Sequence, residues 1–177
     1  MVPSFIRRPF TYATSRYAGH PTRVFAAILK TFALAHLMMD FVGFIVPAAG
    51  PSMLPTLEVA GERLLINKAY RRGRDVKVGD LVSFKAMDVP GKLVLKRVVG
   101  MSGDYVMRYT PGSGNPEMIQ VPQGHVWVVG DNMSSSSDSR IFGPVPMALI
   151  LGRITAKVFP FSERRWIEDG LVPVGRP

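Results

Sequence analysis

A serine that could act as a nucleophile lies in the sequence AAGPSMLPTL, at position 52 of this 177-residue chain. Pro51 and Pro55 restrict the backbone on either side of Ser52, and Gly50 permits another chain to approach closely. A serine hydroxyl attacks a carbonyl only when a neighbouring base removes its proton. Proline and glycine beside a serine are also the usual composition of a turn. The chemistry of Ser52 therefore depends on a base elsewhere in the sequence.

Few residues are candidates for that base, because the chain contains three histidines and no cysteine. Two of the histidines lie in the first 46 residues, and His125 lies in HVWVV, where a lone histidine is more often structural. A lysine serves as a base when burial lowers its pKa to about 7–8. In KLVLKRVVG, strand alternation places Lys96 on the same face as Val94 and Val98. On this pattern alone, a lysine whose amine extends to water is the more common outcome.

The elements that would position these residues are predicted to be strands. After Pro47, short apolar runs with β-branched residues alternate with Gly, Pro and Asp, which is typical of an all-β domain. We assign residues 47–177 to this mainly antiparallel domain. PGSGNPEM at 111–118 has the composition of a hairpin loop. The runs are RLLINKAY, DLVSFKAM, KLVLKRVVG, DYVMRYT, HVWVVGD and RITAKVF.

Two segments precede this domain. Residues 1–23 are rich in Arg, Ser, Thr and Tyr and lack acids, which is typical of a mitochondrial targeting segment or of a disordered basic tail. Residues 24–46 are long and apolar enough to form one transmembrane helix. Lys30, His36 and Asp40 interrupt this span, and a buried amphipathic helix of a soluble domain is the alternative. His36 and Asp40 are spaced i, i+4, so they could pair on one face.

The net charge of +9 is concentrated in two places. The first 46 residues carry +4, and residues 63–77 hold six basic residues against Asp75. Such a stretch can bind nucleic acid or lie near an anionic membrane. It holds one aromatic residue, Tyr70, and no nucleic-acid-binding module, so we expect membrane lipid and no nucleic acid among the partners. The absence of cysteine excludes a thiolate nucleophile, disulfides and cysteine-ligated metal sites.

Four blocks of the sequence together resemble the type I signal peptidase family, serine proteases that use a Ser-Lys dyad. The blocks occur in the order and at the spacings of that family, and the resemblance extends over about residues 24–160. It implies a signal-peptidase-like catalytic domain that uses no cofactor and no metal. The blocks are GPSMLPT at 50–56, GD at 79–80, KRVVGMSGD at 96–104 and GDNMSSSSDSRIFGPV at 130–145.

The resemblance implies a role for each of five residues. Ser52 would attack the scissile carbonyl, and a neutral Lys96 would accept its proton and later deliver it to the leaving amine. Ser136, one of four consecutive serines at 134–137, matches the serine that orients the lysine by a hydrogen bond. Asp138 and Arg140 match a charge pair that supports the site from behind.

Gly50, Met53 and Leu54 are predicted to contact the substrate. Many bacterial relatives carry a hydroxyl at the position of Gly50 that helps to hold the oxyanion, so here the Ser52 N–H would need another donor beside it. Met53 and Leu54, with Phe84, offer apolar surface for the substrate or the bilayer, and ordinary core packing is the alternative.

The short connection at 105–129 between the lysine block and the GDN block resembles the mitochondrial inner membrane branch of the family. DSR at 138–140 together with GPSM at 50–53 favours the first catalytic subunit of that branch. This resemblance implies cleavage of sorting signals from precursor proteins, a single membrane anchor, a catalytic domain in the intermembrane space and pairing with a second catalytic subunit. The alternatives are a bacterial-type signal peptidase and a non-catalytic, membrane-anchored β-domain that binds a partner protein.

Overall fold

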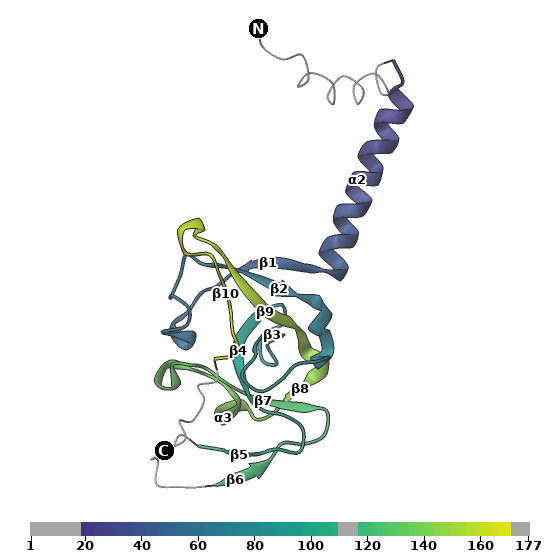
Figure 1. Ribbon diagram of the computed structural model, residues 1–177. Coiled ribbons are helices and arrows are strands. Elements are labelled where there is room, and N and C mark those ends of the chain that lie inside the picture. Colours follow the sequence, from purple (N-terminus) through teal and green to yellow (C-terminus); the bar gives the residue numbers. More distant parts are fainter. Residues whose placement is uncertain (1–18, 110–116, 171–177) are drawn as a thin grey trace, which may run out of the picture. The chain divides into compact units, whose positions relative to one another are not determined.

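The computed structural model describes residues 19–109 and 117–170, and the chain separates into two units, Met1–Asp40 and Phe41–Pro177. The second unit carries the strands (Figure 1). The helices are α2 (Pro21–Phe41) and α3 (Ser139–Phe142), with 3-10 turns η1 (Pro51–Met53), η2 (Lys68–Gly73), η3 (Met133–Ser135), η4 (Met147–Leu149) and η5 (Phe161–Glu163). The strands are β1 (Gly43–Pro47), β2 (Arg63–Asn67), β3 (Leu81–Lys85), β4 (Leu93–Gly100), β5 (Tyr105–Met107), β6 (Met118–Gln120), β7 (His125–Val129), β8 (Val145–Pro146), β9 (Ile150–Phe159) and β10 (Arg165–Trp166).

Helix α2 has the length and composition of a membrane span. Its 21 residues extend about 32 Å at roughly 1.5 Å per residue, and its most apolar window has a mean hydropathy of 1.6. None of its residues is buried. His36 Nε2 lies 3.2 Å from Asp40 Oδ2, which is the i, i+4 pair expected from the sequence.

The predicted span of residues 24–46 is wrong at its C-terminal end. The helix ends at Phe41, and residues 43–47 form strand β1, in which Phe44 pairs with Ile66 and Val46 enters the core. The reason is that a short apolar strand and the last turn of an apolar helix have the same hydropathy. Gly43 fits the strand because a Cβ at this position would overlap the carbonyl oxygen of Ile66.

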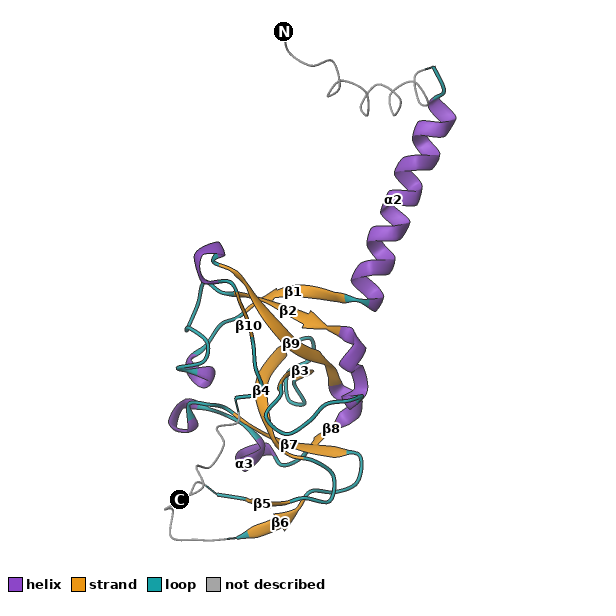
Figure 2. Cartoon of the chain, in the orientation of Figure 1, coloured by secondary structure: helices purple, strands orange, loops and turns teal. Residues whose placement is uncertain are grey.

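The strands form one large antiparallel sheet and one small one, as the predicted all-β fold requires (Figure 2). The large sheet has the order β1-β2-β9-β3-β4-β7-β8, with β10 also paired to β9. The small sheet pairs β5 with β6, and Tyr105 lies opposite Gln120. The predicted loop at 111–118 lies between these two strands and mostly outside the described residues. Because β9 bonds to both β2 and β3, it joins the strand that follows the Ser52 turn to the strand beside Lys96.

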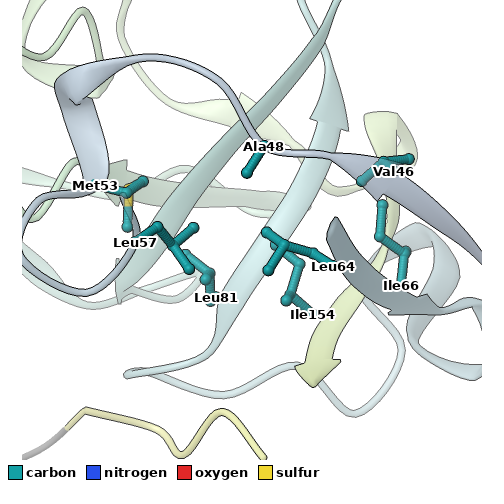
Figure 3. Packing of buried hydrophobic residues seen from close by; sticks show 8 residues of the cluster. All are labelled: Val46, Ala48, Met53, Leu57, Leu64, Ile66, Leu81 and Ile154. Carbon is teal, nitrogen blue, oxygen red and sulfur yellow. The ribbon is translucent and has the colours of Figure 1, made fainter. Parts of the chain in front are cut away.

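Two clusters of buried side chains pack against this sheet near Ser52 and Lys96. The first packs beneath the Ser52 turn and consists of Val46, Ala48, Met53, Leu57, Leu64, Ile66, Leu81 and Ile154 (Figure 3). The second includes Val82, Phe84, Val98, Val126, Val128, Val145 and Ile150. Leu95 packs against the first cluster and Val94 against the second, so strand β4 contributes to both.

The six predicted strand runs all contain strands, whereas four strands were not predicted. β1 was assigned to the membrane span, and β6, β8 and β10 have three residues or fewer, too few for a periodic pattern. The run at 63–70 is strand only as far as Asn67, whose side chain accepts a hydrogen bond from the Ala69 N–H and begins turn η2.

Lys68 and Tyr70 of the basic stretch at 63–77 make cation–π contacts within the domain. The guanidinium of Arg153 lies 4.5 Å from the ring centre of Tyr70, and the amine of Lys68 lies 5.0 Å from that of Phe44. Tyr70 also packs against the second core cluster. The aromatic ring that could have stacked on a nucleic-acid base is therefore already covered by an arginine.

An ion triad with two buried members, Lys157 and Glu62, and one exposed member, Glu163, lies at the C-terminal end of β9. Lys157 Nζ donates to Glu62 Oε1 and to Glu163 Oε2, each at 2.6 Å. Lys157 is 4% exposed and Glu62 is 1% exposed. The Glu62 carbonyl in turn accepts from the Ala48 N–H at 2.9 Å, so the triad supports the segment that leads to Ser52.

We predict that Lys157→Met destabilises the fold by about 3–5 kcal/mol, because it leaves the Glu62 carboxylate buried without a cation. Removing both charges in Glu62→Gln/Lys157→Met should recover much of this loss. The measurement is denaturant unfolding of the detergent-solubilised protein. Lys85→Met, at the exposed end of β3, is the matched control and should change stability by less than about 0.5 kcal/mol. A Lys157→Met protein as stable as this control would contradict the prediction.

Candidate active site

The residue with nucleophilic potential, Ser52, lies in the middle of turn η1. Pro51 occupies the first position of the turn, where its fixed φ suits a helical start. Gly50 precedes it with φ of 110°, a conformation that side-chain-bearing residues rarely adopt. Met53 follows, 3% exposed, and anchors the turn in the first core cluster. The turn is thus held at both ends while the Ser52 side chain faces a groove.

Asn132 fastens this turn to the loop after β7. Its N–H donates to the Ser52 carbonyl at 3.0 Å, and its side-chain Nδ2 donates to the Pro51 carbonyl at 3.1 Å. On the other side, the Gly50 N–H donates to the Val59 carbonyl at 2.8 Å. The backbone around Ser52 is therefore bonded in two directions.

Lys96 lies directly beside Ser52. Its Nζ is hydrogen-bonded to Ser52 Oγ at 2.6 Å, and the residue is 4% exposed. Lys96 lies on β4 opposite Val82 of β3, and Val98 on the same face is fully buried, so the amine does not extend to water as the strand pattern alone favoured. The distance is short enough for direct proton transfer between the hydroxyl and the amine.

Burial lowers the pKa of Lys96 below that of an ordinary lysine. The negative charges of Asp138 and Asp131 oppose this effect, and the positive charge of Lys92 adds to it. The net direction favours the neutral amine, which is the form that can accept a proton.

Asp138 is the centre of a second group of bonds behind the lysine. Its Oδ2 accepts from Ser136 Oγ at 2.6 Å and from the Gly130 N–H at 3.0 Å. Arg140 donates from Nε to Oδ1 at 2.8 Å and from Nη2 to Oδ2 at 2.9 Å. Burial alone would raise the pKa of Asp138, but these hydrogen bonds, above all those of Arg140, lower it. Asp138 therefore stays ionised.

The expected contact of Ser136 differs from the one observed. The resemblance implied that its hydroxyl orients Lys96, whereas the structure has this hydroxyl donating to Asp138. Ser136 is buried, and Ser137 beside it lines the groove. Ser134 instead donates to the side chain of Asn132 at 2.8 Å. The four consecutive serines thus face three different environments.

Gly130 brings these two groups of residues together. A Cβ at this position would overlap Ser136 Oγ and would lie 2.5 Å from the carbonyl oxygen of Ser52. The end of β7, the Ser52 turn and the Asp138 group therefore approach one another through the space that this glycine leaves empty.

An additional ion pair, Arg97 with Asp131, was missed in the sequence. Arg97 donates to Asp131 through Nε at 2.8 Å and Nη2 at 2.7 Å, and Thr56 Oγ1 donates to the same carboxylate at 2.5 Å. Arg97 Nη1 also donates to the Gly79 carbonyl at 2.8 Å. Thr56, Gly79, Arg97 and Asp131 each lie in a different one of the four blocks that carry the family resemblance. The oppositely charged residues next to Lys96 and Gly130 were the signal that could have revealed it.

The dyad lies in a groove of about 490 Å³. One wall is formed by residues 46–50 and the other by residues 92–95. β7 pairs with β4 only from Arg97 onwards, so the part of β4 that lines the groove precedes that pairing. Of the three residues predicted to contact the substrate, Gly50 and Met53 line the groove, whereas Leu54 is not among its lining residues. Phe84, considered as apolar surface, is 1% exposed and belongs to the core.

His125 is not part of this arrangement. It begins β7, and its Nδ1 lies 2.9 Å from the carbonyl of Gln123. Ser52 and Lys96 thus form a hydrogen-bonded pair that does not include His125, and both line the groove.

Comparison with known proteins is consistent with this geometry. The family model for signal peptidase, peptidase S26, matches residues 22–111 and 107–159. Mitochondrial inner membrane protease subunit 1 of Mus musculus is 34% identical over 151 residues, covering 85% of this chain and 90% of the relative. Mitochondrial ATP-independent inner membrane protease subunit 1b of Arabidopsis thaliana is 39% identical over 138 residues, with coverage of 77% and 82%.

A relative named as the other subunit also matches. Mitochondrial inner membrane protease subunit 2 of Danio rerio is 34% identical over 167 residues, covering 90% of each chain. Because these matches extend over most of the chain and include every element that surrounds the Ser52 groove, the protein belongs to the S26 signal peptidase family of serine endopeptidases.

Proposed function

We propose that this protein cleaves sorting or signal peptides from precursor proteins at the mitochondrial inner membrane, with Ser52 as nucleophile and Lys96 as general base. The observation that carries the proposal is the 2.6 Å contact between Ser52 Oγ and the buried Lys96 amine at the groove. The names of the relatives, which are inner membrane protease subunits, support the location, and the family description, signal peptidase, supports the type of substrate.

The reaction follows from the positions of the two side chains. The neutral amine of Lys96 accepts the hydroxyl proton as Ser52 Oγ attacks the scissile carbonyl, which forms a tetrahedral intermediate. The ammonium of Lys96 then returns this proton to the leaving amine, and the C–N bond breaks to give an acyl-enzyme. Water attacks the ester with Lys96 again as base, and Ser52 recovers its proton as the new carboxyl end of the signal peptide leaves.

The oxyanion would be bound by main-chain groups of turn η1. The first N–H groups of a helical turn have no acceptor within the turn, so the Ser52 N–H is suited to this role. Gly50 contributes no side chain, and its N–H is already bonded to the Val59 carbonyl. In place of the hydroxyl found in many bacterial relatives, Gly50 provides the φ of 110° that the turn requires.

We assign Asp138 with Arg140, and Asp131 with Arg97, to the support of the dyad. Each carboxylate is held by two hydrogen bonds from its arginine. Asp131 also connects the loop after β7 to Arg97 of β4 and to Thr56 after turn η1, whereas the bonds of Asp138 hold residues 130–140 together. Ser136 supports the site through Asp138, since its hydroxyl donates to that carboxylate.

Substrate would bind as an extended chain between residues 46–50 and residues 92–95. In each wall the chain runs from N to C toward the dyad, because residues 46–50 precede Ser52 and residues 92–95 precede Lys96. We infer that the residues before the scissile bond lie here and pair with the edge of β4 that β7 leaves open. Gly50 and Met53 would contact the residue next to the cleaved bond.

We further propose that the catalytic domain faces the intermembrane space and pairs with a second catalytic subunit. The basic N-terminal segment supports this orientation, since positively charged flanks stay on the side from which a helix inserts. The similarity to relatives named as subunits 1 and 2 supports the partnership.

Replacing either member of the dyad should abolish cleavage. We expect Ser52→Ala and Lys96→Met each to reduce kcat/KM by about 10⁴-fold or more while the protein still folds and inserts. The assay is release of a sorting peptide from a mitochondrial precursor by the complete membrane protein. Ser135→Ala and Lys85→Met are the matched exposed controls and should keep wild-type rates. Full activity of Ser52→Ala or Lys96→Met would exclude the proposed mechanism.

The rate should fall on the acid side as Lys96 gains a proton. Because burial lowers the pKa of Lys96, the active neutral amine persists toward lower pH than for an exposed lysine and is lost as the pH falls through its pKa. We expect kcat/KM to drop about tenfold per pH unit on this limb. Near-UV circular dichroism over the same range checks that the fold persists. A rate that stays flat from about pH 8 down to pH 5 would contradict the role of Lys96.

Asn132 is predicted to position the nucleophile. Asn132→Asp removes the Nδ2 donor to Pro51 while keeping the N–H bond to the Ser52 carbonyl, and Asn132→Ala removes both this donor and the Oδ1 acceptor of Ser134. We expect kcat to fall by about 10- to 100-fold with little change in KM, because small displacements of a reacting group have such effects. A rise in KM at unchanged kcat would instead show that Asn132 contacts the substrate.

A further inference from the structure

One lysine in the groove has no role in the chemistry described so far. Besides Lys96, the ionisable side chains that line the groove are Glu58, Asp88 and Lys92. Lys92 is exposed, and within the described part of the chain its amine takes part in no ion pair. The turn before β4 fixes its backbone, because its N–H donates to the Val89 carbonyl at 3.2 Å and its carbonyl accepts from the Ala86 N–H at 2.9 Å.

The spacing of Lys92 and Lys96 places both amines toward the same space. They are four residues apart along an extended chain, so they share a face and their Cα atoms are separated by about 13 Å. Val94 lies between them on that face and also lines the groove.

The negative charges near Lys96 are each offset by an arginine. Asp138 is held by Arg140, and Asp131 is held by Arg97, in both cases through two hydrogen bonds. These ion pairs weaken the attraction that the carboxylates exert on a protonated Lys96.

The remaining charges that face the groove do not reverse this balance. Glu58 follows turn η1 in the chain, and Asp88 lies in the turn between β3 and β4; both line the groove. Of the charges outside the two arginine-bound carboxylates, that of Lys92 contributes to the pKa of Lys96, and its effect is to lower it in addition to burial.

We propose that Lys92 helps to keep the catalytic amine neutral by placing a second positive charge in the same groove. This inference rests on the proposed Ser-Lys mechanism. A substrate chain that fills the groove displaces water, lowers the local dielectric and strengthens the repulsion between the two amines. Lys92 therefore acts through the protonation state of Lys96 and does not itself touch the reacting atoms.

The test is the pH dependence of kcat/KM for Lys92 variants of the complete membrane protein. The probe is a peptide that spans the cleavage site of a mitochondrial intermembrane-space precursor. Removing the like charge in Lys92→Gln should raise the pKa of Lys96, so the acid limb should move to higher pH by about half a unit. Lys92→Glu should move it by about one unit, and Lys92→Arg should leave it in place.

Two controls make the result specific. Lys85→Gln removes an exposed lysine at the end of β3, outside the groove, and should not move the limb. The shift for Lys92→Gln should also shrink in about 0.5 M salt, because screening shortens the range of exposed charges.

An acid limb that stays in place for both Lys92→Gln and Lys92→Glu would overturn the inference. A rise in KM without a shift of the limb would also overturn it, since it would make Lys92 a substrate contact. Failure of the underlying mechanism has a different signature, because wild type would then cleave no faster than Ser52→Ala.

Discussion

The architecture of this protein depends on a lysine amine held out of water at 2.6 Å from a serine hydroxyl. A charged amine is costly to bury, so the same burial that lowers its pKa makes it a base. Strand β4 achieves this by supplying Val94 to one core cluster and Leu95 to the other, with Lys96 next in the chain. The fold must therefore keep the Lys96 amine against the Ser52 hydroxyl and exclude water, which would favour the protonated amine.

Two arginine–aspartate pairs reduce the effect of the negative charges that lie near the Lys96 amine. The loop after β7 brings Asp131 and Asp138 close to Lys96, and their free charge would stabilise its ammonium form. Arg97 and Arg140 bind these carboxylates in bidentate fashion, which limits this effect and fixes the loop at the same time. The pairs therefore act on position and on protonation together.

The Ser52–Lys96 pair was predicted because its two members lie in blocks with recognisable spacing. Strand alternation alone placed Lys96 on one face with Val94 and Val98, but it favoured an amine that extends to water. The sequence also revealed most of the sheet, since β2, β3, β4, β7 and β9 are long enough to show a period. It could not separate β1 from the membrane helix, because Phe44 and Val46 are as apolar as the residues of α2. Nor could it show that Ser136 donates to Asp138, since a hydroxyl within reach of two acceptors has no sequence signature.

Contacts made by the main chain were the least visible in the sequence. Asn132 bonds to the carbonyls of Pro51 and Ser52, and Gly130 leaves the space in which the Ser52 carbonyl meets Ser136. Such contacts depend on the approach of two backbones, which neither charge nor hydrophobic period encodes. Glycine is the residue that marks them, because a side chain at position 130 would separate the nucleophile turn from the Asp138 group. The position of the nucleophile is therefore set by residues that carry out no chemistry themselves.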